Sequence, residues 1–200
     1  MMKLLACVFL AMLLAAGRSL ASLPGGGDSS RSFRAVIDMQ VSPHLSSQSS
    51  YRDGGYTISL GFGVNVSPAL QLGVNIYTGR EAIPGGFASP ATGWLPLGGA
   101  SLQVTLFPVT AGEFRPYVAL GYGLYSLAAE DGYNGGGGDI EGGMQWDFSK
   151  YFSLRGGLQY SIIRYHDPTG EAYQAVGFQP FTLRTIGAAL RWSFYPTVLP

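Results

Sequence analysis

Apolar and polar residues alternate strictly through the stretch from Tyr56 to Val66. The even-numbered positions carry apolar side chains, and the odd-numbered positions carry small or polar ones. The alternation starts again after Ser67-Pro68 and continues through Leu70–Tyr77. A period of two places successive side chains on opposite faces of a β-sheet. Two segments of about ten residues joined by a very short turn are long enough to cross a bilayer as tilted strands.

The same alternation recurs along the chain and predicts eight strands. We expect them at Phe33–Val41, Tyr56–Val66, Leu70–Tyr77, Gly98–Phe107, Pro116–Leu127, Asp139–Phe148, Phe152–Tyr165 and Phe181–Phe194. Residues 116–127 carry apolar side chains in both parities, and there we assign Val118, Leu120, Tyr122 and Leu124 to the outer face. Throughout, the apolar parity is expected to face outward, toward lipid.

The predicted connections alternate in length. Ser67-Pro68 and Ser149–Tyr151 are tight turns, and Pro108–Arg115 is moderately longer. The other four are long, at Ser42–Gly55, Thr78–Leu97, Ala128–Gly138 and His166–Pro180. Short periplasmic turns and longer extracellular loops are typical of outer-membrane barrels. Since closure leaves no unpaired sheet edge in hydrocarbon, we predict an all-β fold, an eight-stranded antiparallel up-and-down transmembrane β-barrel over residues 33–195.

The beginning of the chain has the features of a secretory signal peptide over residues 1–21. Lys3 supplies the positive start, Leu4–Ala16 the apolar stretch, and Ser19-Leu20-Ala21 the small-residue cleavage site. Residues 22–32 are then expected to be an N-terminal periplasmic segment, and residues 196–200 a C-terminal tail. No later stretch is apolar enough to predict a membrane-spanning helix.

Charge and cysteine content narrow the function classes. Cys7 leaves with the signal peptide, so the mature chain is expected to have no disulfide and no thiolate metal site. Removal of Lys3 and Arg18 from a chain with 12 basic and 12 acidic residues leaves a slight acidic excess, which does not indicate nucleic-acid binding. Only 12% of residues are charged, against about 25% in soluble domains, and a surface that faces lipid needs few charges.

On these features the chain resembles the small eight-stranded outer-membrane barrels of Gram-negative bacteria, the group of the OmpA transmembrane domain, OmpX and the opacity proteins. Leu190–Phe194 looks like the aromatic-ended final strand that the barrel-assembly machinery recognises in that group, although Pro196–Pro200 follow it here. The resemblance implies a monomer in the outer membrane whose partners are lipid and the assembly machinery.

Five charged residues are predicted to point into the barrel and to form an interior charge network: Arg34, Asp38, Glu141, Arg155 and Arg191. An eight-stranded barrel is only wide enough for side chains to fill it. Charges inside it must therefore pair with one another or stay hydrated. We interpret them as a structural polar interior that closes the barrel, with an ion path as the alternative. The inward glycines 61, 63, 73, 121 and 123 are the positions at which a narrow wet gap could form in this interior.

The two histidines fall in predicted loops. His44-Leu45-Ser46 has the His-x-Ser spacing of outer-membrane lipid A deacylases, and His166-Asp167 could form half of a hydrolytic relay. Catalysis needs a nucleophile, a base and an orienting acid that converge in space. Polar loop residues explain these pairs more simply, so we predict no catalytic residue, no cofactor and no metal site. Gly135–Gly138 lacks the lysine of a phosphate loop and is interpreted as a flexible loop.

Three functions remain open at this point. The main hypothesis is a non-enzymatic outer-membrane barrel with a structural or surface-interaction role, in which the loops meet any extracellular ligand. The second is a small-solute pore or ligand-binding barrel. The third is a secreted, soluble, lipocalin-like binder, which would place its apolar face inward. The Gly-x-Trp motif of lipocalins is absent, and a glycine- and serine-lined face would make a poor apolar cup.

Overall fold

The computed structural model describes residues 34–47, 54–82, 94–127, 133–166 and 181–196. These residues form one closed antiparallel barrel in which each strand pairs with its sequence neighbours and β1 pairs with β8. The strands are β1 (Arg34–Ser46), β2 (Gly54–Ser67), β3 (Leu70–Ala82), β4 (Trp94–Leu106), β5 (Phe114–Leu127), β6 (Tyr133–Trp146), β7 (Phe152–Tyr165) and β8 (Phe181–Phe194). The predicted fold class is confirmed.

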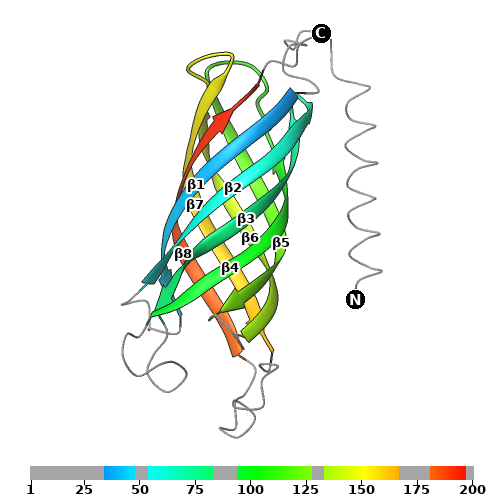
Figure 1. The fold of residues 1–200 in the computed structure, drawn as a ribbon. Helices are drawn as coiled ribbons and strands as arrows, with labels where there is room; N and C mark the ends of the chain where they lie inside the picture. Colours follow the sequence, from blue (N-terminus) through cyan, green and yellow to red (C-terminus); the bar gives the residue numbers. More distant parts are fainter. Residues whose placement is uncertain (1–33, 48–53, 83–93, 128–132, 167–180, 197–200) are drawn as a thin grey trace, which may run out of the picture.

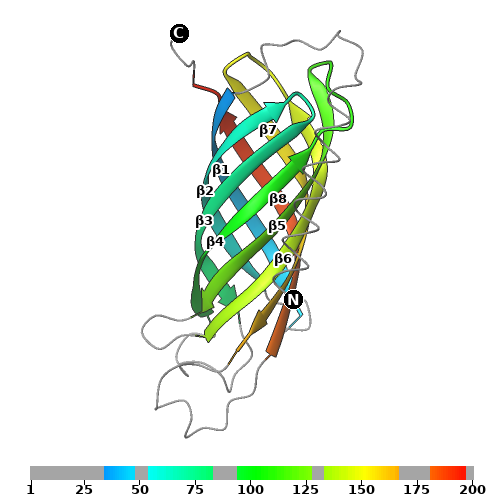
Figure 2. The same cartoon turned by 90° about the vertical axis from the view of Figure 1, so that its right-hand side faces the viewer.

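The strands are strongly tilted, and the two ends of the barrel differ in the length of their connections (Figures 1 and 2). At the turn end, the top in Figure 1, β2–β3, β4–β5 and β6–β7 are connected through residues 68–69, 107–113 and 147–151. The opposite end leads into the long connections, and we call it the loop end. It comprises residues 42–46, 54–57, 77–82, 94–99, 125–127, 133–138, 163–165 and 181–185. The rest of the sheet is the barrel body.

In the barrel body, the predicted faces agree with the observed ones. Leu102 and Leu158 on the outer face are 59% and 69% exposed, whereas Ser101, Gln103 and Arg155 in the lumen are buried. All four residues assigned to the outer face of β5 are exposed. The apolar parity thus forms an outer band suited to lipid, and the lumen is polar. A lipocalin-like binder would place its apolar face inward, so the hypothesis of a secreted, soluble, lipocalin-like protein is wrong.

Five strands extend further toward the loop end than predicted. β1 continues to Ser46, β2 begins at Gly54, β3 continues to Ala82, β4 begins at Trp94, and β6 begins at Tyr133. The expectation of a loop at Gly135–Gly138 is wrong, because these glycines pair with β5 on one side and β7 on the other. The real connections at residues 42–55, 78–97 and 128–138 are therefore shorter than expected.

The extra strand length was not predicted because the polarity of the two faces reverses there. Inward positions at the loop end form an apolar cluster of Leu95, Leu97, Tyr125, Leu127, Ile163, Tyr165 and Leu183. Outward positions are mostly polar, glycine or proline, and Leu45, Tyr56 and Ala82 are among the exceptions. The polar ones include Thr78, Arg80, Asn134, Arg164, Thr182 and Arg184. An apolar inside and a polar outside suit a sheet surrounded by water. The geometry of alternation persists, but the apolar-outward pattern used for prediction does not.

A belt of aromatic rings surrounds part of the turn end. Phe114 stacks on Trp146 with 5.9 Å between ring centroids, and the contacts continue through Phe148 and Phe152 to Phe194. Such girdles mark the bilayer interface in outer-membrane barrels. Tyr117 and Tyr195 are buried in the lumen and do not belong to the belt. No helix in the described ranges is long and apolar enough to span a membrane.

Candidate functional site

Two regions of the lumen contain side chains that could carry a function. The first is the arginine cluster, formed by Arg155 and Arg191 with Asp38 and Glu141. The second is a small cavity at the loop end, which we call the loop-end chamber. Alternation places both sets of side chains on the inward parity of their strands.

Arg191 on β8 is the centre of the arginine cluster. Its Nη2 donates to Glu141 Oε2 at 3.3 Å, and its Nη1 lies 3.7 Å from Asp38 Oδ2. The guanidinium also donates to Gln40 on β1 and to Gln103 on β4. β4 and β8 are opposite walls of the barrel, so this side chain and Gln103 together bridge the whole lumen.

Arg155 on β7 forms a second bridge. Its Nε donates to Gln145 Oε1 at 2.6 Å, and its Nη2 donates to Gln71 on β3, again the opposite wall. Gln71 Nε2 donates to Asp38 Oδ2 at 3.1 Å, which joins the two bridges. The Arg155 guanidinium also lies over the rings of Phe107 and Tyr117, at 5.3 and 5.7 Å from their centroids. Cations over aromatic faces gain additional electrostatic stabilisation when they are desolvated.

The four charged members of the cluster are almost completely buried. Tyr117 adds an O–H donated to Glu141 Oε1 at 2.5 Å, so both oxygens of that carboxylate are bonded. Buried charges are tolerated when they are paired and hydrogen-bonded, and removing one partner of a buried pair costs about 3–5 kcal/mol. The cluster therefore stabilises the barrel only as a complete set.

Arg34 does not join this cluster, contrary to the sequence-based expectation. Its Nη2 donates to the Lys150 carbonyl oxygen at 2.8 Å, and its guanidinium lies 5.3 Å from the centroid of the Tyr195 ring. Arg34 begins β1, so its side chain reaches the rim of the turn end and not the middle of the lumen. Arg115, which the sequence analysis did not select, is buried near the same end and pairs with Asp147 at 2.8 Å.

At two of the inward glycines, Gly61 and Gly121, the structure leaves no room for the wet gap that was considered. A side chain at Gly61 would collide with Asn75 and contact Asp38, and a side chain at Gly121 would collide with the Asp139 carboxylate. The space beside these two glycines is therefore occupied by polar groups from neighbouring strands. This close approach is the reason that β2 and β5 need glycine at those positions.

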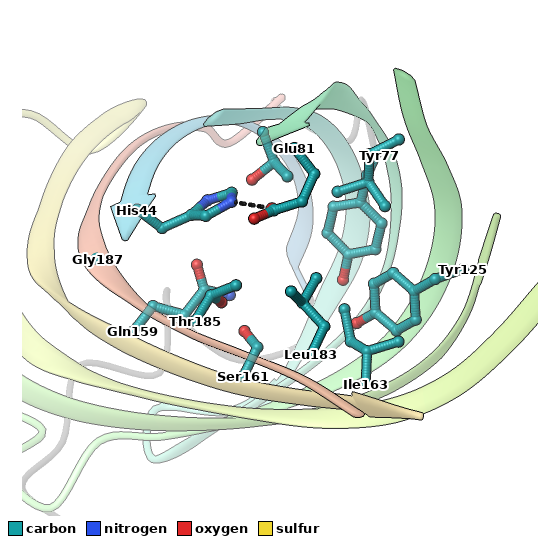
Figure 3. A pocket seen from close by; sticks show the side chains of 12 residues that line it. His44, Tyr77, Glu81, Tyr125, Gln159, Ser161, Ile163, Leu183, Thr185 and Gly187 are labelled. Atoms are coloured by element: carbon teal, nitrogen blue, oxygen red, sulfur yellow. Dashed lines mark hydrogen bonds and ion pairs between the residues drawn. The ribbon is translucent and has the colours of Figure 1, made fainter. Parts of the chain in front are cut away.

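The loop-end chamber lies between polar and apolar walls (Figure 3). It has a volume of about 30 Å³. His44 and Glu81 form its polar side, and His44 Nε2 lies 2.7 Å from Glu81 Oε2. Tyr77 and Tyr125 line it with stacked rings 5.7 Å apart, and Leu97, Ile163 and Leu183 complete the apolar side. Among these residues, only His44 was considered as a functional residue in the sequence analysis. The apolar-outward pattern used there does not identify the others, because the polarity of the two faces is reversed at the loop end.

His44 is in β1 and not in a loop, which corrects the prediction. Its Nδ1 lies 3.2 Å from the Ser42 carbonyl oxygen, and its Nε2 faces Glu81, so both ring nitrogens are engaged. A general base needs a free nitrogen to accept a proton from the nucleophile. The side chain of Ser46 is completely buried, and His44 is not oriented to activate it.

His166 directly follows β7, is exposed, and donates its backbone N–H to the Asn134 carbonyl oxygen at 2.9 Å. Its candidate partner Asp167 lies outside the described residues. Within the described ranges, no group of three or more histidine, cysteine, aspartate or glutamate side chains is placed to hold a metal ion.

No protein-family model matches the chain. No curated protein matches it either. Solved structures do match. The crystal structure of Neisserial surface protein A (NspA) superposes with a TM-score of 0.61 at 13% identity, covering 80% of this chain and 96% of that one. The solid-state NMR structure of outer membrane protein AlkL in DMPC lipid bilayers superposes with a TM-score of 0.55 at 14% identity, covering 90% and 97%.

At these identities the likeness concerns the fold. Both structures are matched over nearly their whole length, and the closed order of eight antiparallel strands is the architecture that the sequence resemblance implied. The chain therefore has the fold of the small eight-stranded outer-membrane β-barrels.

Proposed function

We propose that this protein is a non-enzymatic outer-membrane β-barrel with a closed polar interior, whose loops carry its contacts with the surroundings. The observation that carries the proposal is the pair of bridges across the lumen, Arg191 to Gln103 and Arg155 to Gln71. Each joins opposite walls. Asp38 connects them, because it accepts a hydrogen bond from Gln71 and forms an ion pair with Arg191. A lumen filled in this way supports a structural barrel and counts against a general porin.

The outer surface supports a location in the outer membrane. The barrel body has an apolar outer band with an aromatic belt at the turn end, as a barrel in lipid requires. Closure through β1 and β8 leaves no sheet edge exposed to hydrocarbon. We therefore infer that lipid is a partner, that the barrel-assembly machinery inserts the chain, and that the barrel acts as a monomer after export and removal of residues 1–21.

The geometry at the histidines supports a non-enzymatic role. Both ring nitrogens of His44 are engaged, and no serine hydroxyl in the described part of the chain bonds to either of them. Any recognition is then assigned to the long connections, which a rigid scaffold presents at one end of the barrel. The central parts of these connections lie outside the described residues.

Two experiments test the proposal. Membrane fractionation combined with electrophoresis of unheated and boiled samples should place the protein in the outer membrane and show a mobility shift on boiling. Planar-bilayer recording of the purified mature protein should show no steady conductance on the scale of a general porin. Steady porin-scale conductance would contradict the closed interior and support the pore alternative.

A further inference from the structure

The Glu81 carboxylate in the loop-end chamber has an unused hydrogen-bonding capacity. The residue is 0% exposed, and Oε2 faces His44 Nε2 at 2.7 Å. Oε1 is buried and has no hydrogen-bond partner within the described part of the chain. Figure 3 shows the carboxylate directed into the chamber. A buried carboxylate oxygen without a partner is costly, so the site favours a group that donates hydrogen bonds.

The charge around the chamber is also unbalanced. Asp139 Oδ1 accepts a 3.4 Å hydrogen bond from Gln159, which lines the chamber, but Asp139 Oδ2 is buried without a described partner. Neither Glu81 nor Asp139 forms an ion pair with an arginine or lysine in the described ranges. Among the described residues, the buried arginines belong to the arginine cluster or, in the case of Arg115, pair at the turn end. The basic side chain that lines the chamber is His44, which is cationic only when protonated.

The walls define the kind of cation that fits. The stacked rings of Tyr77 and Tyr125 offer aromatic surface, and Leu97, Ile163 and Leu183 offer apolar surface. Aromatic faces attract organic cations, whereas a divalent metal needs several oxygen or nitrogen ligands. No such ligand group exists in the described part of the chain. A volume of about 30 Å³ accommodates roughly two water-sized groups, which suits an ammonium head and its first carbon.

We propose that the loop-end chamber binds a primary alkylammonium ion. The ammonium donates to Glu81 Oε1, and its remaining donors face the wall hydroxyls of Thr57 and Ser161. Its alkyl part rests on the apolar side and points toward the loop end. The inference goes beyond the closed-barrel function and is independent of it. Bilayer conductance tests the arginine cluster, whereas amine binding tests the chamber, so either can fail alone.

The test uses the refolded mature protein in lipid nanodiscs and follows the tyrosine ring signals by NMR. Titration with n-butylammonium chloride should shift the Tyr77 and Tyr125 signals saturably, whereas n-butanol and sodium butyrate at equal concentrations should not. Glu81→Gln keeps the shape and removes the charge, and should weaken binding roughly tenfold or more. The matched control Glu113→Gln alters an exposed acid at the turn end and should bind as the parent does.

If n-butanol shifts the two tyrosine signals as much as n-butylammonium does, the pocket is purely apolar and the proposal is overturned. If potassium chloride competes with n-butylammonium at equal concentration, the chamber is an inorganic cation site, and the proposal is also overturned. The same holds for unchanged affinity in a folded Glu81→Gln barrel. If that variant does not show the heat-dependent gel shift of a folded barrel, Tyr125→Leu replaces it. This second change removes an aromatic face but keeps an apolar wall, and affinity for butylammonium should fall severalfold while the n-butanol result stays negative.

Discussion

The barrel body and the loop end belong to one hydrogen-bonded sheet, yet their side chains are arranged in opposite ways. In the body, Leu102 faces outward and Gln103 lies in the lumen, whereas at the loop end Arg184 faces outward and Leu183 lies inside. The backbone alternation is continuous through both. The difference therefore reflects the surroundings, since a sheet in hydrocarbon needs an apolar exterior and a sheet in water needs an apolar core.

The two regions also differ in how they fill the lumen. In the body, arginine, glutamine and carboxylate side chains meet across the barrel and satisfy most of one another's polar atoms. At the loop end, apolar side chains form the core and leave a chamber beside Glu81. The polar side chains that fill the body leave little space for a ligand, whereas an apolar core beside a carboxylate with an unpartnered oxygen is suited to hold one.

The largest effect is expected from breaking the arginine cluster. Arg191→Met keeps much of the side-chain volume but leaves Asp38 and Glu141 without their shared cation. The free energy of unfolding should fall by about 3–5 kcal/mol. Urea titration of the barrel in lipid vesicles, followed by tryptophan fluorescence, measures it. Arg184→Met makes the same change at an outward position of the loop end and should stay within about 0.5 kcal/mol. Equal losses in the two variants would remove the distinction between the regions.

The second prediction concerns the outer surface. Leu102→Arg places a charge in the apolar band and should cost about 2–4 kcal/mol in lipid. Thr78→Arg, an outward position at the loop end, should cost about 0–1 kcal/mol, as expected near or beyond the interface. The same urea titration compares the two variants. A heavy cost at Thr78 with none at Leu102 would mean that the bilayer surrounds the other region.

The sequence was sufficient for the barrel body because alternation and outward hydrophobicity coincide there. β7 and β8 begin and end at the residues predicted, and the inward placement of Asp38, Glu141, Arg155 and Arg191 followed from parity. The extent of β1, β3, β4 and β6 could not be predicted in the same way, because residues such as Leu97 and Leu183 put the apolar side inward. A search for reversed alternation would have found these strand ends.

The candidate site was predictable only in part, for a related reason. Parity identifies which face a charged residue occupies, but not its height along the barrel axis. Arg34 has the correct parity, yet it lies at the rim and bonds to Lys150. Glu81 was assigned to a loop, so its contact with His44, which lies 37 positions away in the sequence, could not be foreseen. That contact depends on the register of β1, β2 and β3, which alternation alone does not specify.

A smaller effect should distinguish the two faces of β7 at adjacent positions. Ile163 lies in the loop-end core and is 4% exposed, whereas Ile162 faces outward and is 43% exposed. Ile163→Val removes one buried methylene and should cost about 0.5–1.5 kcal/mol. Ile162→Val exchanges one outward β-branched side chain for another and should remain within about 0.5 kcal/mol. Equal costs, measured by the same urea titration, would show that the loop end has no packed interior of its own.

The smallest effect is expected from shortening the connection between β3 and β4. Deleting residues 85–91 removes no residue of either strand, because β3 ends at Ala82 and β4 begins at Trp94. Loop-closure entropy changes by only about 0.6 kcal/mol for each doubling or halving of loop length, so stability and the gel shift on boiling should be nearly unchanged.

Extending the deletion to residues 81–95 also removes Glu81 and Leu95, which belong to the chamber and the apolar cluster. That longer deletion should lose stability markedly and abolish butylammonium binding. If the short deletion already prevents assembly, the division between a self-sufficient strand scaffold and a dispensable connection is wrong. If the long deletion is tolerated as well as the short one, the loop end contributes nothing to the fold, and its reversed polarity has no structural role.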